Sequence, residues 1–172
     1  SMAAGRRPPA RRRPKEVDEM PLTEFENVAA LRARTGQEVA MSDWLTLTQE
    51  RVDLFAEATG DHQWIHVDPQ RAKRESPFGA PVAHGYLTLS LLAKFLVDSF
   101  LLKEARMGVN YGVNRVRFAS PVRVGDRIRG RFTLAGVDDI QGGVQILWQA
   151  QVEIEGQAKP ACIAELISRR YF

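Results

Sequence analysis

Residues 84–102 read HGYLTLSLLAKFLVDSFLL and predict one long helix that is apolar on nearly every side. Ser90, Lys94 and Asp98, spaced four apart, form its narrow polar edge. A helix of this composition has to be covered by other elements over most of its surface. Lys94 and Asp98 also interrupt the apolar run, which argues against a membrane-spanning segment here. The sequence therefore predicts a fold built around one buried helix.

Downstream of this helix, apolar and polar residues alternate. Residues 127–134 and 144–154 both follow this pattern, as half-buried strands do. A hairpin is expected over residues 138–143, and Glu155-Gly156 begins the turn to a last strand near residues 160–170. Because the strands follow the helix and do not alternate with helices, we expect the α+β class, with an antiparallel sheet wrapped around one long central helix.

The residues upstream of the long helix predict shorter elements. Thr23 and Glu26 fit a capping box at the start of a helix, and Gly36 fits its end. Thr48 is placed to cap a second helix that Gly60 closes. The expected elements are a helix over residues 23–35, a strand over residues 39–47, a helix through residue 58, an irregular segment over residues 61–67 and a short helix that begins at Asp68-Pro69.

Charge is unevenly distributed along the 172 residues, whose formal net charge is +3. Residues 1–15 contain six of the 24 basic residues and no acidic residue, which leaves 18 basic against 21 acidic residues in the remainder. We therefore expect a flexible basic arm over residues 1–20, followed by one domain over residues 21–172. A basic arm can bind nucleic acid, but a solvated extension is the simpler interpretation, so no nucleic-acid partner is expected.

Cysteine usage limits the classes of protein to consider. Cys162 is the only cysteine, which excludes an internal disulfide and a thiolate metal cluster. No secretory signal is recognisable at the N-terminus, so we expect a cytoplasmic protein without a membrane partner. Cys162 falls in a predicted strand, where a cysteine is more often a small buried apolar residue than a nucleophile.

The segment that follows Gly60 is the first candidate site, because all three histidines lie in it or just after it. Asp61 comes directly after a helix-ending glycine, and His66 follows five residues later. An irregular connection can bring this carboxylate and this imidazole to one cavity wall, where they could hold a water molecule and share proton transfer. The alternative is a solvated turn at Asp61 with His66 filling a gap. We expect His62 in solvent and Asp68 as a helix cap.

The start of the long helix is the second candidate site. The first N–H groups of a helix have no partner within it, so those after His84 can bind a developing oxyanion. Gly85 would let a carbonyl group approach this backbone closely. It would equally let the helix pass close to the sheet, and the sequence alone does not decide between the two. Tyr86 and Asn114 are further candidates for lining the pocket.

Taken together, these motifs resemble the MaoC-like dehydratases, a family of hot-dog-fold proteins that includes the (R)-specific enoyl-CoA hydratases. The resemblance covers roughly residues 37–170, and the wording ATGDHQWIHVD over residues 58–68 is closest to the NodN-like branch. The motifs that carry it are Asp61-x4-His66, His84-Gly85 and Arg117-Phe118-x2-Pro121-Val122-x2-Gly125-Asp126.

The resemblance implies a role for three residues. Asp61 and His66 match the dyad that orients one water molecule for addition across a trans-2-enoyl thioester, and Gly85 matches the residue whose backbone N–H helps to hold the thioester oxygen. The product would be a (3R)-3-hydroxyacyl thioester of coenzyme A or an acyl carrier. The resemblance implies a homodimer whose two sheets join side by side, with no cofactor and no metal. Many relatives carry Asn-Pro where this chain has Gln63-Trp64, a difference that affects loop shape and acyl-chain fit.

Two other functions remain open at the level of sequence. A hot-dog acyl-CoA thioesterase would use the same helix terminus to hold an oxyanion but would hydrolyse the thioester. A non-catalytic acyl-thioester-binding protein would bind the same ligand without turnover.

Four polar residues are left out of the candidate site because a simpler role explains them. Arg127, Arg129 and Arg131 form a basic strip that could meet the phosphates of coenzyme A, but solvated arginines on an exposed sheet face explain it equally well. Ser90 could face the pocket, although a local bond from its hydroxyl to a helix carbonyl is the expected arrangement.

Overall fold

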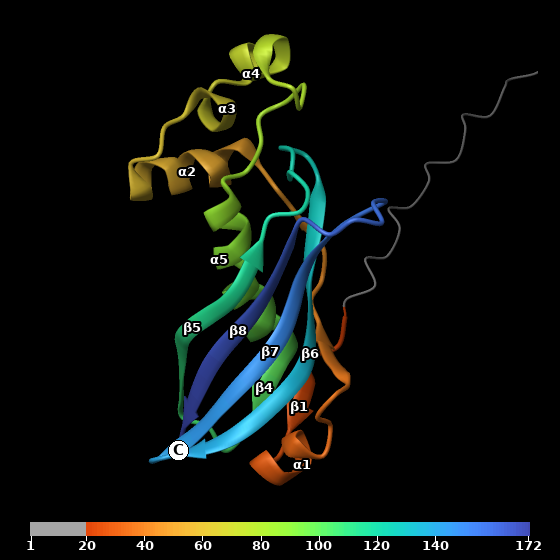
Figure 1. Cartoon of the computed structure of the whole chain (residues 1–172), viewed down its shortest axis with the longest axis vertical. Coiled ribbons are helices and arrows are strands. Elements are labelled where there is room, and N and C mark those ends of the chain that lie inside the picture. The colour runs from red at the N-terminus through yellow and green to blue at the C-terminus, as the bar shows by residue number, and fades with distance from the viewer. Residues whose placement is uncertain (1–19) are drawn as a thin grey trace, which may run out of the picture.

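A six-stranded antiparallel sheet curves around helix α5 (Gly85–Ser99) in the computed structural model, which describes residues 20–172 (Figure 1). The arm expected over residues 1–20 lies outside the described residues, except for Met20. The sheet has the order β2 (Glu38–Met41), β6 (Arg127–Ile140), β7 (Gly143–Ile154), β8 (Cys162–Tyr171) and β5 (Met107–Arg117), and β3 (Leu45–Thr46) also pairs with β6. The α+β arrangement expected from the sequence is confirmed.

The remaining elements lie at the two ends of α5 (Figure 1). At its C-terminal end, β1 (Thr23–Phe25) pairs in parallel with β4 (Phe100–Leu102), beside α1 (Val28–Arg32). At its N-terminal end lie α2 (Gln49–Thr59), α3 (Trp64–Val67) and α4 (Pro69–Glu75), which follow one another along the chain. These three helices form the part of the fold that positions the candidate site.

Helix α5 is buried as its composition predicts. It packs against the sheet closely enough that a Cβ atom on Gly130 of β6 would lie 2.7 Å from the Cβ of Phe95. The expected polar edge is exposed, and Ser90 donates its hydroxyl hydrogen to the carbonyl of Tyr86 at 2.7 Å, the local bond that was anticipated. Its buried residues are Leu87, Thr88, Leu91, Leu92, Phe95, Leu96 and Ser99.

Within residues 20–172, the structure contains no helix with the length and apolar character needed to cross a membrane.

Four expectations about the elements were wrong. Residues 23–25 form strand β1 instead of the first turn of a helix, because their backbone pairs with β4, and α1 starts only after Asn27, whose side chain accepts from the N–H of Ala30 at 2.9 Å. The long helix correspondingly ends at Ser99. The strand expected over residues 39–47 is divided into β2 and β3, and the segment over residues 61–67 contains the short helix α3.

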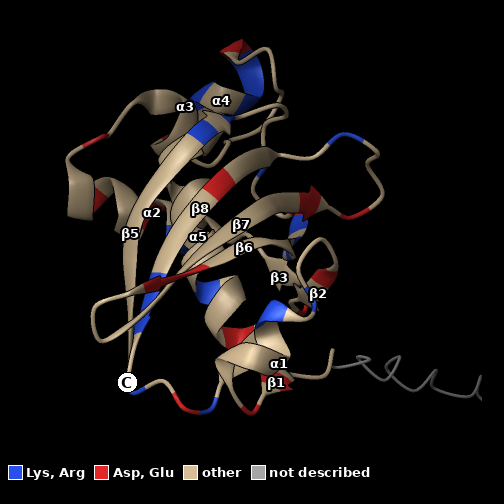
Figure 2. Ribbon diagram, turned by 60° about the horizontal axis from the view of Figure 1, so that its bottom comes forward, with Lys and Arg blue, Asp and Glu red and all other residues tan. Residues whose placement is uncertain are grey.

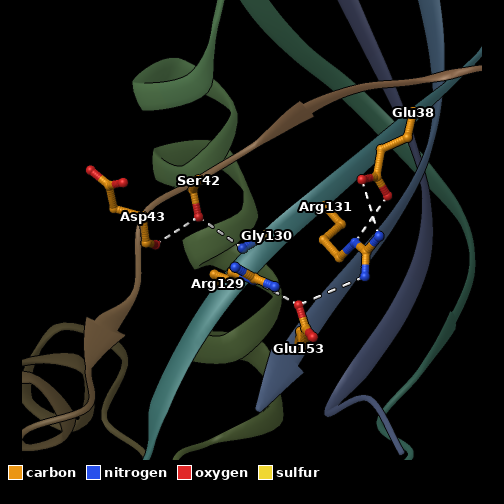
Figure 3. Close-up of polar contacts among 7 residues, drawn as sticks. All are labelled: Glu38, Ser42, Asp43, Arg129, Gly130, Arg131 and Glu153. Atoms are coloured by element: carbon orange, nitrogen blue, oxygen red, sulfur yellow. Dashed lines mark hydrogen bonds and ion pairs between the residues drawn. The ribbon is translucent and has the colours of Figure 1, made fainter. Parts of the chain in front are cut away.

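The basic strip on β6 is an ion-paired sheet surface (Figure 3). Arg131 binds Glu38 through two bonds of 2.9 and 3.1 Å, and Arg129 binds Glu153 at 2.7 Å. Arg127 is paired in the same way, with Glu155 at 2.8 Å. Basic and acidic residues are likewise interspersed over the strands in Figure 2. The strip therefore offers no unpaired guanidinium that would single it out as a phosphate site.

Candidate active site

Asp61 is placed by the end of helix α2. Gly60 closes this helix in the left-handed conformation, with φ of 78°, and its N–H donates to the carbonyl of Ala56 at 2.8 Å. A positive φ is the conformation that glycine adopts most readily. The turn leaves Asp61 on the connection to α3, where its side chain is exposed and Oδ1 accepts weakly from the N–H of Gln63 at 3.4 Å.

His66 lies on α3 and is buried, with 7% of its surface exposed. Its Nδ1 lies 2.6 Å from the carbonyl oxygen of Val82, which can only accept, so Nδ1 carries the hydrogen and Nε2 has a free lone pair. Burial lowers the pKa of His66, and nearby His84 lowers it further, against the opposing effects of the Val82 bond and the Asp61 charge. A neutral imidazole with a free lone pair is suited to accept a proton.

His84 is a third polar residue at this site, and its place was not anticipated. Its ring stacks on that of His66, with centroids 3.8 Å apart and planes inclined by 23°. Its Nε2 donates to the backbone carbonyl of Asp61 at 2.9 Å. Ligand-type atoms of Asp61, His66 and His84 lie within 4.8 Å of one another. The two residues singled out from the sequence are thus brought together, with His84 beside both.

A carboxylate and two imidazoles are also donors that divalent metal ions accept, so a candidate ligand group stands where none was expected from the sequence. The ring planes of His66 and His84 are nearly parallel, however, so one ion cannot lie in both planes at bonding distance. We therefore interpret the cluster as a group that moves protons.

The N-terminus of α5 begins beside this cluster. His84 is the residue before its first turn, and its side chain makes no capping bond to the helix. The first N–H groups of α5 therefore have no cap from that side chain and can meet an anionic group. A Cβ atom on Gly85 would lie 2.7 Å from the ring of Phe118, so glycine is needed here for packing as well. Both interpretations of Gly85 thus agree with the structure.

The candidate pocket residues lie in different surroundings. Tyr86 is 69% exposed, and its ring meets that of Phe118 edge-on at 5.9 Å, directly over the start of α5. Asn114 is exposed on β5, opposite Glu165 of β8, and does not line the two grooves that run along α5. Tyr86 is therefore placed at the candidate site, whereas Asn114 is placed on the edge strand.

The simpler interpretations of three other residues agree with the structure. His62 is exposed and pairs with Glu57 at 2.6 Å. Asp68 caps α4 by accepting from the N–H of Arg71 at 3.0 Å. Cys162 is fully buried, and desolvation raises the pKa of its thiol to about 11, so it is not a reactive thiolate.

Comparison with known proteins agrees with this arrangement. Residues 30–155 match the family described as MaoC like domain. The chain belongs to the MaoC-like dehydratase family. It is 53% identical over 84% of its length to 3-hydroxyacyl-thioester dehydratase Z of Mycobacterium tuberculosis, covering 96% of that protein. It is 46% identical over 83% of its length to nodulation protein N of Rhizobium leguminosarum bv. viciae, covering 89% of that protein.

The fold of this MaoC-like chain is shared with solved structures. It superimposes on the R-hydratase PhaJ1 of Pseudomonas aeruginosa with a TM-score of 0.60 and 19% identity, over 78% of this chain and 79% of that one. The expected hot-dog fold is therefore confirmed, as is the resemblance on which it rested. Sequence analysis did not single out the side chains of His84 and Phe118 as parts of the site. Both residues belong to motifs that carried the resemblance, where His84 precedes Gly85 and Phe118 follows Arg117, and this position was the signal that could have pointed to them.

Proposed function

We propose that this protein is an (R)-specific 2-enoyl-CoA hydratase and 3-hydroxyacyl-thioester dehydratase, which adds water across a trans-2-enoyl thioester or removes it. The observation that carries the proposal is the position of Asp61 and His66 beside the free N-terminus of α5. The 53% identity to a protein named as a 3-hydroxyacyl-thioester dehydratase supports it. No structural observation favours the thioesterase or the non-catalytic alternative.

In the hydration direction, the neutral His66 accepts a proton from water through Nε2, while the water oxygen bonds to C3. The electron pair of the C2–C3 double bond moves toward the thioester, and negative charge develops on its carbonyl oxygen. The N–H of Gly85 binds this oxygen, and one such donor contributes about 2.7–4 kcal/mol to stabilising the transition state. The proton taken from water then returns to C2 through the dyad, so Asp61 and His66 end the cycle in their starting protonation states.

The test is hydration of crotonyl-CoA, followed by loss of the enoyl-thioester absorbance, in the wild type and in Asp61→Asn. We expect turnover in the wild type and a loss of about 10²–10⁴-fold in the variant. The control is His62→Asn, because His62 lies on the same loop but points to Glu57 at the surface. Wild-type turnover in Asp61→Asn would contradict the assignment of the dyad.

The same assay separates the two alternatives. A thioesterase would release free thiol from crotonyl-CoA, and that thiol can be titrated. A binding protein would be stabilised by crotonyl-CoA in thermal unfolding without either reaction. Crotonyl thioester on an acyl carrier protein should be tested in parallel, because the proposal includes either carrier.

We also propose that the protein works as a homodimer joined through strand β5. This strand is the edge of the sheet, and its apolar side chains Val109, Tyr111 and Val113 are 38–56% exposed. An exposed apolar edge strand offers unpaired backbone groups to a second strand. Two grooves of about 380 and 330 Å³ lie between α5 and the β5 side of the sheet, next to this edge. Light scattering should show a dimer for the wild type and a monomer after Tyr111→Lys with Val113→Lys.

A further inference from the structure

We infer that His84 is a positioning residue that holds both members of the dyad, an inference that rests on the proposed function. Its Nε2–H donates to the backbone carbonyl of Asp61, and one face of its ring stacks on the ring of His66. Both contacts come from one side chain at the start of α5, the same point at which the thioester oxygen would bind. His84 therefore ties the proton-transfer groups to the oxyanion-binding backbone.

His84 is itself firmly held. Only 3% of its surface is exposed, and the ring of Phe55 on α2 packs against it with centroids 4.9 Å apart. Because Nε2 donates to the carbonyl of Asp61, the neutral ring carries a lone pair on Nδ1. That Nδ1 is buried without a hydrogen-bond partner among the described residues. A buried polar atom without a partner costs free energy, and such atoms are retained where they serve a function.

The contacts of His84 act on the reaction through two separate routes. The bond to the backbone carbonyl of Asp61 fixes the loop after Gly60, and with it the carboxylate, whose one bond within residues 20–172 is the weak one from the N–H of Gln63. The stacked ring fixes the orientation of His66, and positive charges on both rings at this distance would repel each other, which disfavours a positive charge on His66. A displacement of about 1 Å in a catalytic group can cost about 10²-fold in rate, so both routes bear on turnover.

Two titratable side chains and two hydrogen-bonding groups face His66 from the elements packed around it. His84 faces it from α5 and Asp61 from the loop before α3. On α2, Gln49 donates both to the carbonyl of His66 at 2.8 Å and to Asp53 at 2.9 Å. Val82 contributes only its backbone carbonyl. Of these groups, His84 is the one that opposes protonation of His66 and that a side-chain substitution can remove.

Two substitutions separate the two routes. His84→Gln keeps an N–H donor that can reach the carbonyl of Asp61 but removes the ring. His84→Phe keeps a ring between Phe55 and His66 but removes the donor. We expect His84→Phe to lower kcat by about 10–10²-fold with KM changed less than about 3-fold, and His84→Gln to lose less than about 10-fold. His62→Gln is the matched control, because that histidine is exposed and bonded to Glu57.

The pH dependence of kcat/KM distinguishes a positioning role from a merely structural one, because loss of a structural contact alone would not change the titration of His66. In His84→Phe, the acidic limb of kcat/KM should shift to higher pH, because a neighbour that opposes protonation of His66 is gone. Nitrogen-15 NMR of the imidazoles reports the same titration directly, and the spectrum is simple because the chain has three histidines. Wild-type kcat together with an unshifted titration of His66 in His84→Phe would overturn the inference. So would an equal loss in both variants with an unshifted titration.

The tautomers of the wild type provide a test that needs neither a variant nor turnover. We expect His66 to carry its proton on Nδ1 and His84 on Nε2, as their carbonyl partners require. A wild-type His84 protonated on Nδ1 instead would remove the bond to Asp61 and overturn the inference, even if His84→Phe failed to fold. Absence of hydratase activity with the expected tautomers would instead count against the proposed function alone.

Discussion

Two regions of this protein concentrate charged and titratable side chains, and they differ in how those side chains are paired. On the outer face of β6, each arginine of the strip has a glutamate within 2.9 Å, and Figure 3 shows the pairs of Arg129 and Arg131. At the N-terminus of α5, both imidazoles donate to backbone carbonyls, and each keeps a lone pair on its other ring nitrogen. Ligand-type atoms of both histidines lie within 4.8 Å of one from Asp61. Each arginine on the sheet face is paired with a carboxylate. In the histidine cluster, by contrast, the lone pairs of the two rings are free to accept a hydrogen bond from a bound molecule. Incomplete hydrogen bonding, and not charge density, therefore distinguishes the candidate site from the sheet face.

The largest effect expected from this comparison is on turnover, and it separates two histidines on one loop. His66→Ala should lower kcat for crotonyl-CoA by about 10²–10⁴-fold, because Nε2 of His66 accepts the proton in the mechanism that we propose. His62→Ala should leave kcat within about 2-fold, because His62 is an exposed partner of Glu57. Circular dichroism should show the same fold for both variants. Equal losses of kcat in the two variants would contradict the special role that we assign to the buried His66.

Gly85→Ala should lower the free energy of unfolding. The added Cβ would lie 2.7 Å from the Phe118 ring, and accommodating one extra methyl group in a packed site typically costs about 1–3 kcal/mol. Chemical denaturation measures this cost. If packing is the cause, adding Phe118→Ala to the same chain should reduce the extra cost of the Gly85 substitution. A cost unchanged by the second substitution would place the origin in the backbone of α5.

The free energy of unfolding should depend on pH in the direction expected for a buried neutral histidine, that is, it should fall as the solution becomes more acidic. The pKa of His66 is lowered in the folded protein, so the unfolded chain binds this proton more readily as pH falls through about 6.5. The free energy of unfolding should therefore decrease as pH falls from about 6.5 toward the folded pKa of His66, and the decrease should be smaller in His66→Gln. His62, whose pKa is raised by Glu57, contributes with the opposite sign. Denaturation midpoints between pH 5 and 8 test this.

The smallest effect is expected on the ion-paired face. Arg129→Met should change the free energy of unfolding by no more than about 1 kcal/mol, because pairs near a surface contribute little. Turnover of crotonyl-CoA should stay at the wild-type level. A large rise in KM for this variant would show that the strip meets the phosphates of coenzyme A after all.

The sequence predicted the architecture well because the decisive signals are long. The apolar run of α5 and the alternation in β6 and β7 extend over many residues, so local preferences and tertiary packing agree. The helix expected over residues 23–35 failed because the capping-box pattern of Thr23 and Glu26 competes with backbone pairing to β4, a partner more than 70 residues away. Local patterns do not report such distant pairing.

The candidate site was predicted in part for a related reason. Asp61, His66 and Gly85 stand in short motifs, and those motifs could be identified from the resemblance. The stacking of His84 on His66, by contrast, depends on how α5 meets α3 across 17 residues of intervening chain, and the orientation of each ring is set by a bond to a main-chain carbonyl. Backbone carbonyls are present at every residue, so sequence cannot indicate which one a histidine will use.

The parallel pairing of β1 with β4 has a practical consequence for handling the protein. It fastens Thr23–Phe25 to the end of the central helix, at the opposite end of the molecule from α3 (Figure 1). Removing the chain through residue 25 would deprive β4 of its backbone partner and uncover Phe100, which packs on Phe25 with ring centroids 5.9 Å apart. Trimming should therefore stop before Thr23, and this end of the molecule is the suitable place for a tag or a surface linkage that must leave the candidate site beside α3 clear.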